Sequence, residues 1–176
     1  MPDAQTRESR LRAFFRSELA EIGFAHDLVF TTEELAGACC WAPPGRWRVP
    51  ARTTVREVPA MGAVFGRRLP LAFWSRLRME RRHPSRPRHF YLAFVGVEPG
   101  SQGRGLGSRL MFPVLSEADA AGAGAYLEAS TPRSRALYER HGFGVVQEMR
   151  LPLGGPALWR MWREPFGYAR PGSVFS

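Results

Sequence analysis

Glycines at every second position, directly after the most apolar strand-like run of the sequence, constrain the fold more than any other feature. Residues 89–97 read HFYLAFVGV, which is typical of a buried strand, and Glu98-Pro99-Gly100 ends this run. Gly103, Gly105 and Gly107 then lead into a segment, about 104–121, whose apolar residues recur at helical spacing. A strand that passes through a glycine loop into a helix predicts a β–α–β crossover at the centre of the chain.

Further strands and helices are expected around this crossover. Helices are predicted over about 4–22, 61–67, 71–82 and 134–141, and strands over 27–31, 35–43, 125–130, 145–151 and 157–162. Pro113 lies within the central helix and is expected to kink it or to remove one hydrogen bond. The whole pattern predicts an α/β fold with a mixed sheet, in a single domain spanning residues 1–176.

The glycine loop suggests a site for phosphate, because glycines let backbone N–H groups approach a ligand at a helix N-terminus. Two common phosphate motifs do not fit. The dinucleotide pattern GxGxxG fails, because Gly103 and Gly105 are followed by Gly107 and Ser108. The Walker A loop fails because the chain contains no lysine: all 25 basic residues are arginines. A purely structural turn remains the alternative for the loop.

The arginine content gives a formal net charge of +9, which could indicate a nucleic-acid-binding surface. The arginines are spread from Arg7 to Arg170, however, so a coding preference for arginine is the favoured interpretation and no nucleic-acid partner is expected. The absence of lysine also excludes a lysine Schiff base.

Targeting signals and disulfides are not expected either. Cys39 and Cys40 are adjacent, which argues against a disulfide framework and against a metal site. The polar N-terminus is no signal peptide, and no stretch approaches the ~18 apolar residues of a membrane span. A soluble cytoplasmic protein without a membrane partner is therefore expected.

Two motifs resemble the GNAT superfamily of acyl-CoA-dependent N-acetyltransferases. Val97-Glu98-Pro99 followed by Gln102-Gly103-Arg104-Gly105-Leu106-Gly107 is similar to the family signature Gln/Arg-x-x-Gly-x-Gly/Ala after a strand ending in Val-x-Pro. Downstream, Tyr138-Glu139-Arg140-His141-Gly142-Phe143 resembles the family's Tyr-Glu-x-x-Gly-Phe. The resemblance covers about residues 88–165 and implies a central twisted mixed β-sheet with helices on both faces and a splayed strand pair holding CoA.

The resemblance also implies how acetyl-CoA is bound. Residues 88–165 would form the acetyl-CoA-binding core, and residues 1–87 the variable acceptor-side half. The glycine loop would hold the pyrophosphate, and residues 95–97 would pair with the pantetheine arm, with the N–H of Val97 polarising the acetyl carbonyl and Gly96 marking a bulge. The predicted acetyl-CoA contacts are Val95, Gly96, Val97, Gln102, Gly103, Arg104, Gly105, Leu106, Gly107, Ser108, Thr131, Ser134 and Tyr138, without a metal. Thr131 stands where the family often has asparagine.

Tyr138 matches the family's general acid, which protonates the departing thiolate; a core tyrosine is the alternative. The general base is less constrained. Glu128 is the first candidate, because a carboxylate in an apolar strand is costly unless it is used or paired. An ion pair with an arginine such as Arg133 or Arg150 is the alternative for Glu128. Glu98 and His89 are weaker candidates for the base.

The predicted activity is direct transfer of an acetyl group, within a ternary complex, to a primary amine of a small molecule. A peptide or protein N-acetyltransferase and a non-catalytic acyl-CoA-binding module remain alternatives. The acceptor wall is expected from the first helix and residues 46–88. Aromatic side chains could build a pocket for the amine or simply pack, and the candidates are Trp41, Trp47, Phe73, Trp74, Trp159 and Trp162. Family members commonly have another strand before this helix, so a partner chain could complete the sheet edge in a homodimer.

Overall fold

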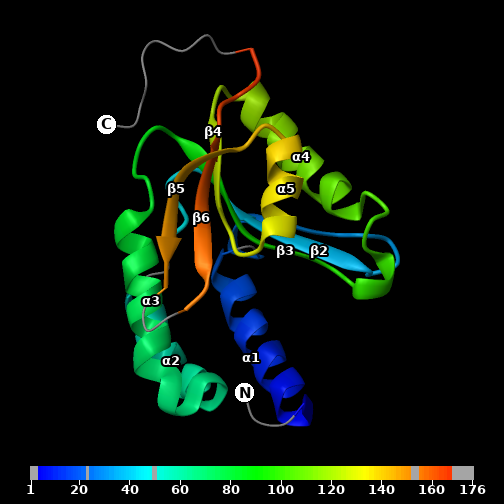
Figure 1. Cartoon of the computed structure of the whole chain (residues 1–176). Helices are drawn as coiled ribbons and strands as arrows, with labels where there is room; N and C mark the ends of the chain where they lie inside the picture. The colour runs from blue at the N-terminus through cyan, green and yellow to red at the C-terminus, as the bar shows by residue number, and fades with distance from the viewer. Residues whose placement is uncertain (1–3, 23, 49–50, 152–154, 168–176) are drawn as a thin grey trace.

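The computed structural model describes residues 4–22, 24–48, 51–151 and 155–167, and it has a six-stranded mixed sheet with helices on both faces (Figure 1). The helices are α1 (Ala4–Ile22), α2 (Ala51–Phe65), α3 (Leu69–Arg82), α4 (Leu106–Ala120) and α5 (Pro132–Arg140). Short 3-10 turns lie at Phe24–His26, Gly66–Arg68 and Pro99–Ser101. The strands are β1 (Val29–Thr31), β2 (Gly37–Ala42), β3 (His89–Val97), β4 (Gly124–Ala129), β5 (Gly144–Arg150) and β6 (Ala157–Arg163).

The strand order across the sheet is β1-β2-β3-β4-β6-β5. Only β3 and β4 are parallel, which confirms the predicted crossover through α4, and every other neighbouring pair is antiparallel. The mixed sheet predicted from the sequence is therefore confirmed. The homodimer expected at its first edge stays a prediction.

The predicted short helix at 61–67 was wrong in its bounds, because α2 begins at Ala51 and ends at Phe65. Thr54, Val55 and Val58 are poor helix formers, and Pro59 lies inside the helix. Packing of α2 against α1 and α3 overrides these local preferences. By contrast, α4 runs from Leu106 to Ala120 as one helix in spite of Pro113.

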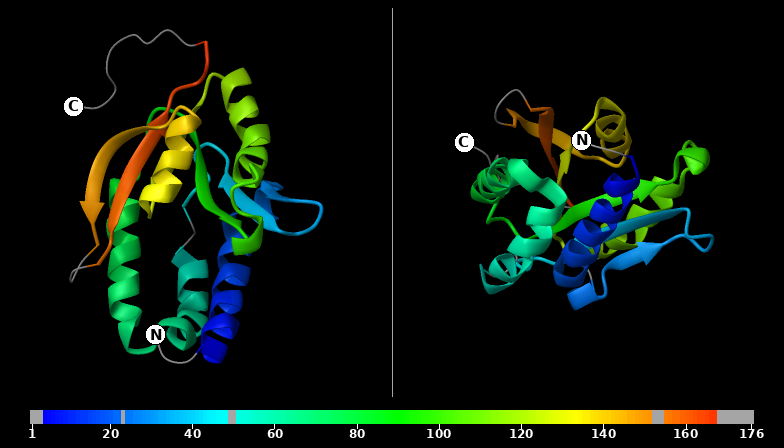
Figure 2. Two further views of the ribbon diagram at one scale, coloured as in Figure 1. Left: turned by 45° about the vertical axis from the view of Figure 1, so that its right-hand side comes forward. Right: turned by 90° about the horizontal axis from the view of Figure 1, so that it is seen from below.

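The two faces of the sheet are covered by different helices. On one face, buried side chains of α4 and α5, including Met111, Val114 and Tyr138, pack on Leu92 and Leu127. On the other face, Ile22 of α1 packs with Cys40 and Ala42, with Trp47 and Tyr91 at the margin of this cluster. Figure 2 shows α1, α2 and α3 extending together below the sheet, away from α4 and α5.

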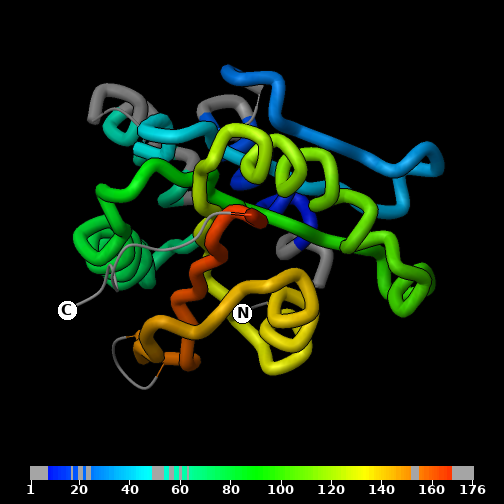
Figure 3. The backbone as a smooth tube through the Cα atoms, turned by 90° about the horizontal axis from the view of Figure 1, so that it is seen from above, coloured from blue at the N-terminus to red at the C-terminus, as the bar shows by residue number. Residues whose placement is uncertain are grey.

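The sheet opens between β3 and β4. Their pairing runs from His89 opposite Gly124 to Leu92 opposite Leu127, although both strands continue further. Figures 1 and 3 show β2 and β3 running away from β6 beyond this point. The register shift on β3 lies between Leu92 and Phe94, which leaves Ala93 as the extra residue. The bulge predicted at Gly96 is therefore misplaced, because Gly96 pairs regularly with Ala38.

Candidate active site

A cavity of about 550 Å³ lies where the sheet opens, and we call it the splay cavity. Its walls come from the end of β3, the glycine loop, the first turn of α4, and α5. The lining residues are Val95, Gly96, Val97, Ser101, Gln102, Gly103, Gly105, Leu106, Gly107, Ser108, Thr131, Arg133, Ser134, Leu137, Tyr138 and Arg140. Two segments that are far apart in the sequence, and that each carry one of the two motifs, thus share one cavity.

The glycine loop turns sharply into α4. Gly103 and Gly105 have φ angles of +83° and +77°, which side chains other than glycine adopt at a cost. Gln102 anchors the loop, because its Nε2 donates a 2.9 Å hydrogen bond to the carbonyl of Val97. Gly105 is the N-cap of α4, so the N–H groups of the first helical turn lie at the cavity. This arrangement suits a phosphate or pyrophosphate.

The backbone of β3 also faces the splay cavity. The N–H of Glu98 donates to the carbonyl of Ala36 on the β2 side. In an antiparallel pair the polar groups of successive residues point to opposite sides, so those of Val97 and Val95 point away from β2 and towards the opening. The groups of Gly96 point towards β2. The N–H of Val97 is therefore oriented as the predicted role in carbonyl polarisation requires.

The start of α5 is held by a capping box. Thr131 Oγ accepts a 3.1 Å hydrogen bond from the N–H of Ser134, and Ser134 Oγ accepts a 3.2 Å bond from the N–H of Thr131. Both side chains line the splay cavity, so the two residues predicted to contact acetyl-CoA also fix the direction of α5. The sequence pattern Thr-x-x-Ser could have indicated this second role.

Tyr138 lies on α5, and its side chain is buried and belongs to the cavity lining. Its ring packs edge-on against Phe143, with 6.1 Å between the ring centroids. Among the residues that the structure describes, none forms a side-chain hydrogen bond with the Tyr138 hydroxyl. Burial raises the pKa of Tyr138 to about 12, so the phenol keeps its proton at neutral pH. A protonated phenol facing a ligand cavity is suited to act as an acid.

Glu128 lies on β4 but does not line the splay cavity. Tyr126 Oη donates a 2.8 Å hydrogen bond to Glu128 Oε1, and Tyr91 donates to the same carboxylate. Arg160 Nε donates to the oxygen of Tyr126 at 2.9 Å. We call these four residues the Glu128 cluster. The predicted alternative was an ion pair with an arginine such as Arg133 or Arg150. Glu128 instead accepts hydrogen bonds from two tyrosines, and the positive charge of Arg160 also lowers its pKa. Burial is the main cause of the raised pKa of Glu128, which suits a base.

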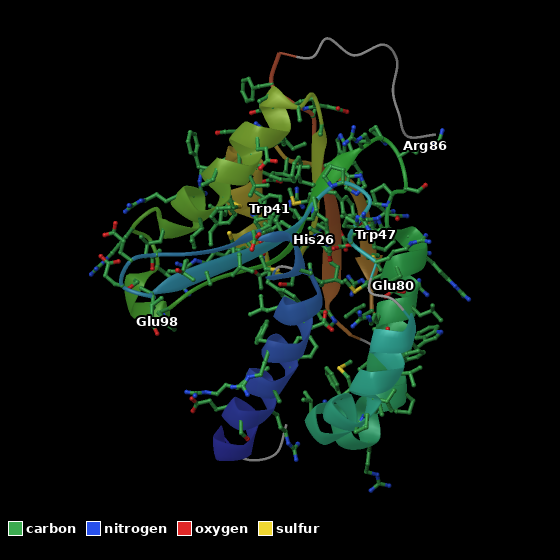
Figure 4. All side chains as sticks on the ribbon, turned by 180° about the vertical axis from the view of Figure 1, so that it is seen from behind. His26, Trp41, Trp47, Glu80, Arg86 and Glu98 are labelled. Atoms are coloured by element: carbon green, nitrogen blue, oxygen red, sulfur yellow. The ribbon has the colours of Figure 1, made fainter. Side chains whose placement is uncertain are left out.

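Two histidines and a tryptophan pack beside the Glu128 cluster. Figure 4 shows Trp47 beside the upper end of α3, where its ring stacks on His83 with 3.7 Å between centroids. His89 Nδ1 lies 2.8 Å from the carbonyl of Pro87 and must donate to it, so Nε2 of neutral His89 accepts from His83 Nε2 at 3.0 Å. Burial lowers the pKa of both histidines, so His89 serves as a packed neutral group.

The splay cavity contains twelve of the thirteen residues predicted to contact acetyl-CoA, and the exception is Arg104. Sequence reasoning did not place Ser101, Arg133, Leu137 or Arg140 among the predicted contacts, although Leu137 and Arg140 lie within or beside the second motif. Within the described ranges, no group of three or more His, Cys, Asp or Glu side chains could hold a metal ion. In the same ranges, no helix is long and apolar enough to cross a membrane.

Comparison with known proteins identifies the family. The sequence model of the Acetyltransferase (GNAT) family matches residues 4–143, which is most of the chain. The chain belongs to the GNAT family. An uncharacterised N-acetyltransferase of Schizosaccharomyces pombe is 25% identical in an alignment of 162 positions, and this alignment covers 83% of the present chain. The match spans 64% of the length of that yeast relative.

Solved acetyltransferase structures share the fold of this family member. A Corynebacterium glutamicum structure, described as histone acetyltransferase HPA2 and related acetyltransferase, has a TM-score of 0.65 and 23% identity, covering 98% of this chain and 82% of its own. The Drosophila melanogaster polyamine N-acetyltransferase has a TM-score of 0.58 and 20% identity, covering 93% of this chain and 82% of its own. The GNAT fold predicted from two local motifs is thus confirmed along nearly the whole chain.

Proposed function

We propose that this chain transfers the acetyl group of acetyl-CoA directly to a primary amine of a small molecule, within a ternary complex. The observation that carries the proposal is the splay cavity, in which the glycine loop, the end of β3 and Tyr138 meet. The residues present fit acetyl-CoA: the first turn of α4 would hold the pyrophosphate, and the exposed backbone edge of Val95 and Val97 would pair with the pantetheine arm. Acetyl-CoA supplies the activated acetyl group.

The roles of the chain's own groups follow from their positions. The N–H of Val97 would polarise the acetyl carbonyl, and the Tyr138 phenol would protonate the departing sulfur. Glu128, on the opposite face of β4 from the α4 core, would take a proton from the incoming ammonium, directly or through water. The acceptor and acetyl-CoA would thus approach the opening of the sheet from different faces.

A small acceptor is favoured by what covers the Glu128 cluster. Arg160 donates to the carbonyl of Arg82 at the end of α3, and the ring of His83 contacts that of Tyr126 at 4.7 Å between centroids. Glu18 of α1 forms an ion pair with Arg76 of α3 on the same side of the molecule. These contacts narrow the approach to Glu128, which suits a small amine better than a protein surface. The net charge of +9 also disfavours a polycationic acceptor.

The test is an acceptor screen with labelled acetyl-CoA over small primary amines, amine-containing antibiotics and peptides, which follows the release of CoA and the labelled product. We expect turnover with one or more small amines. The Tyr138→Phe variant should lower kcat by at least about tenfold while the affinity for acetyl-CoA stays within about twofold. Turnover with peptides alone would establish a peptide acetyltransferase, and tight CoA binding without any turnover would establish a binding module.

A further inference from the structure

His141 contacts the glycine-loop end of α4 from the far end of α5. Its Nε2 lies 2.8 Å from Ser108 Oγ, although 33 residues separate the two in the sequence. Ser108 lines the splay cavity and lies in the first turn of α4, whereas His141 is the C-cap residue of α5 and is absent from the lining. The contact therefore links an imidazole behind the cavity to a hydroxyl inside it.

The position of His141 is fixed by backbone contacts that do not involve Ser108. Its N–H donates a 2.9 Å hydrogen bond to the carbonyl of Tyr138, which closes the last turn of α5. Its carbonyl accepts a 2.9 Å bond from Arg163 Nε, and the same guanidinium forms two 2.7 Å bonds with Asp119 of α4. The backbone of His141 is thus held in place before any ligand arrives, and its imidazole contacts the Ser108 hydroxyl, whose proton can rotate.

The direction of the hydrogen bond depends on what else Ser108 contacts. Without a ligand, either the imidazole or the hydroxyl can donate. A phosphate oxygen accepts only, so the proton of a Ser108 hydroxyl that binds phosphate points at the phosphate. The lone pairs of Ser108 Oγ then face His141, and the Nε2–H of His141 is the donor. The bond to the phosphate becomes stronger because the hydroxyl is itself hydrogen-bonded.

We infer that His141 is a positioning residue, which holds the Ser108 hydroxyl as a donor to the pyrophosphate of CoA. This inference rests on the proposed function, since it takes the splay cavity as the CoA site. The groups around the imidazole favour its neutral form: burial, Arg140 of α5 and Arg163 of β6 lower the pKa of His141, and Asp119 is paired with Arg163. The contribution of His141 is therefore one directed hydrogen bond rather than a positive charge.

Calorimetric titration with CoA, without an acceptor, tests the inference on the full chain. The variants are Ser108→Ala, His141→Met, the double variant, and His141→Gln, whose side-chain N–H stands near the position of Nε2. We expect Ser108→Ala and His141→Met each to weaken CoA binding by about tenfold, the size of one hydrogen bond to a charged group. The double variant should bind no more weakly than either single variant, because both changes remove the same interaction. His141→Gln should stay within about threefold of the unsubstituted chain.

Several results would overturn the inference. In one, the two single effects add in the double variant, which would mean that His141 acts independently of Ser108. In another, His141→Gln binds as weakly as His141→Met, which would indicate a packing role. His26→Met is the matched control and should leave CoA affinity unchanged, since His26 lies in the turn after α1, outside the cavity lining. If His141→Met does not fold, His141→Asn takes its place, because its shorter side chain cannot reach Ser108 Oγ, and it should bind CoA as weakly as Ser108→Ala. Failure of the unsubstituted chain to bind CoA would instead refute the proposed function.

Discussion

Tyr126 directs its phenolic proton at Glu128 Oε1 across 2.8 Å, from the next position on the same face of β4. Arg160 Nε donates to the same phenol oxygen at 2.9 Å, so the only hydrogen of that hydroxyl is committed to the carboxylate. Glu128 is thereby held as an acceptor in one orientation. Burial raises the pKa of Glu128, whereas the bonds from Tyr126 and Tyr91 lower it, and the net result is a raised value.

The Glu128→Gln variant should lower kcat/KM by about 100-fold or more, because the amide cannot take a proton from the acceptor. In the unsubstituted chain, kcat/KM should fall as the pH drops through the pKa of Glu128, and the raised pKa places this fall above the usual range of a glutamate. The variant should show no such acidic limb. CoA affinity is the control and should change less than twofold, because Glu128 does not line the splay cavity. If kcat/KM of Glu128→Gln still falls at low pH as in the unsubstituted chain, a residue other than Glu128 is the base.

The sequence could predict the splay cavity because both of its motifs are local. The glycine spacing indicates a backbone turn, and Tyr138 with Gly142 indicates the end of a helix. Neither motif depends on contacts with residues far away in the sequence. The Glu128 cluster could not be predicted in the same way. Its members come from three strands, and only the register that places Tyr91 opposite Tyr126, and Glu128 opposite Arg160, brings them together.

The positions of the bulge and of α2 also depend on contacts between residues far apart in the sequence, so the sequence alone did not predict them correctly. Ala93 carries no turn chemistry, so the sequence favoured Gly96 for the bulge, whereas the register between β2 and β3 decides its position. The start of α2 depends on packing against α1 and α3, which overrides the weak helix propensity of its residues.

Gly105→Ala should weaken CoA binding through backbone strain alone. A Cβ at Gly105 would meet no atom within 4 Å, but its φ of +77° costs other residues about 1 kcal/mol or more. Relaxing the strain would turn the first N–H groups of α4 away from the pyrophosphate. Gly100→Ala is the matched control, because it has the same open surroundings without a positive φ. Titration with CoA should show several-fold weaker binding for Gly105→Ala only; equal effects of the two variants would refute the strain argument.

Gly124→Ala should destabilise the fold without touching the site. A Cβ there would lie 2.3 Å from Trp162 Cζ2 and within 3.0 Å of two further ring atoms, and the buried indole has little room to move. Overpacking of this kind costs roughly 1–3 kcal/mol. For a chain of this size, the thermal midpoint should fall by roughly 2–4 °C for each kcal/mol. Gly144→Ala, whose Cβ would meet only the Trp162 carbonyl at 4.0 Å, should leave the midpoint nearly unchanged. A stable Gly124→Ala variant would show that Trp162 can move.

Asp119→Asn should break the bidentate ion pair between Asp119 and Arg163, in which the guanidinium donates two hydrogen bonds of 2.7 Å to the carboxylate. The Arg163 side chain is 6% exposed and that of Asp119 is 25% exposed, so we expect a loss of about 2 kcal/mol in the free energy of unfolding, below the value for a fully buried pair. The hydrogen bonds from Arg163 lower the pKa of Asp119. The stabilisation is therefore complete above the ordinary pKa of an aspartate and is lost as the pH falls through the lowered value.

Urea unfolding at neutral pH and at about pH 3 measures this linkage. The difference between the unsubstituted chain and Asp119→Asn should narrow at the lower pH. The control is Glu139→Gln, which breaks an exposed pair with Arg135 on α5 and should cost less than about 0.5 kcal/mol at either pH. A difference that does not depend on pH would mean that Asp119 stabilises the chain through packing rather than through its charge. Because Arg163 also holds the carbonyl of His141, Asp119→Asn should in addition weaken CoA binding modestly if the position of His141 matters.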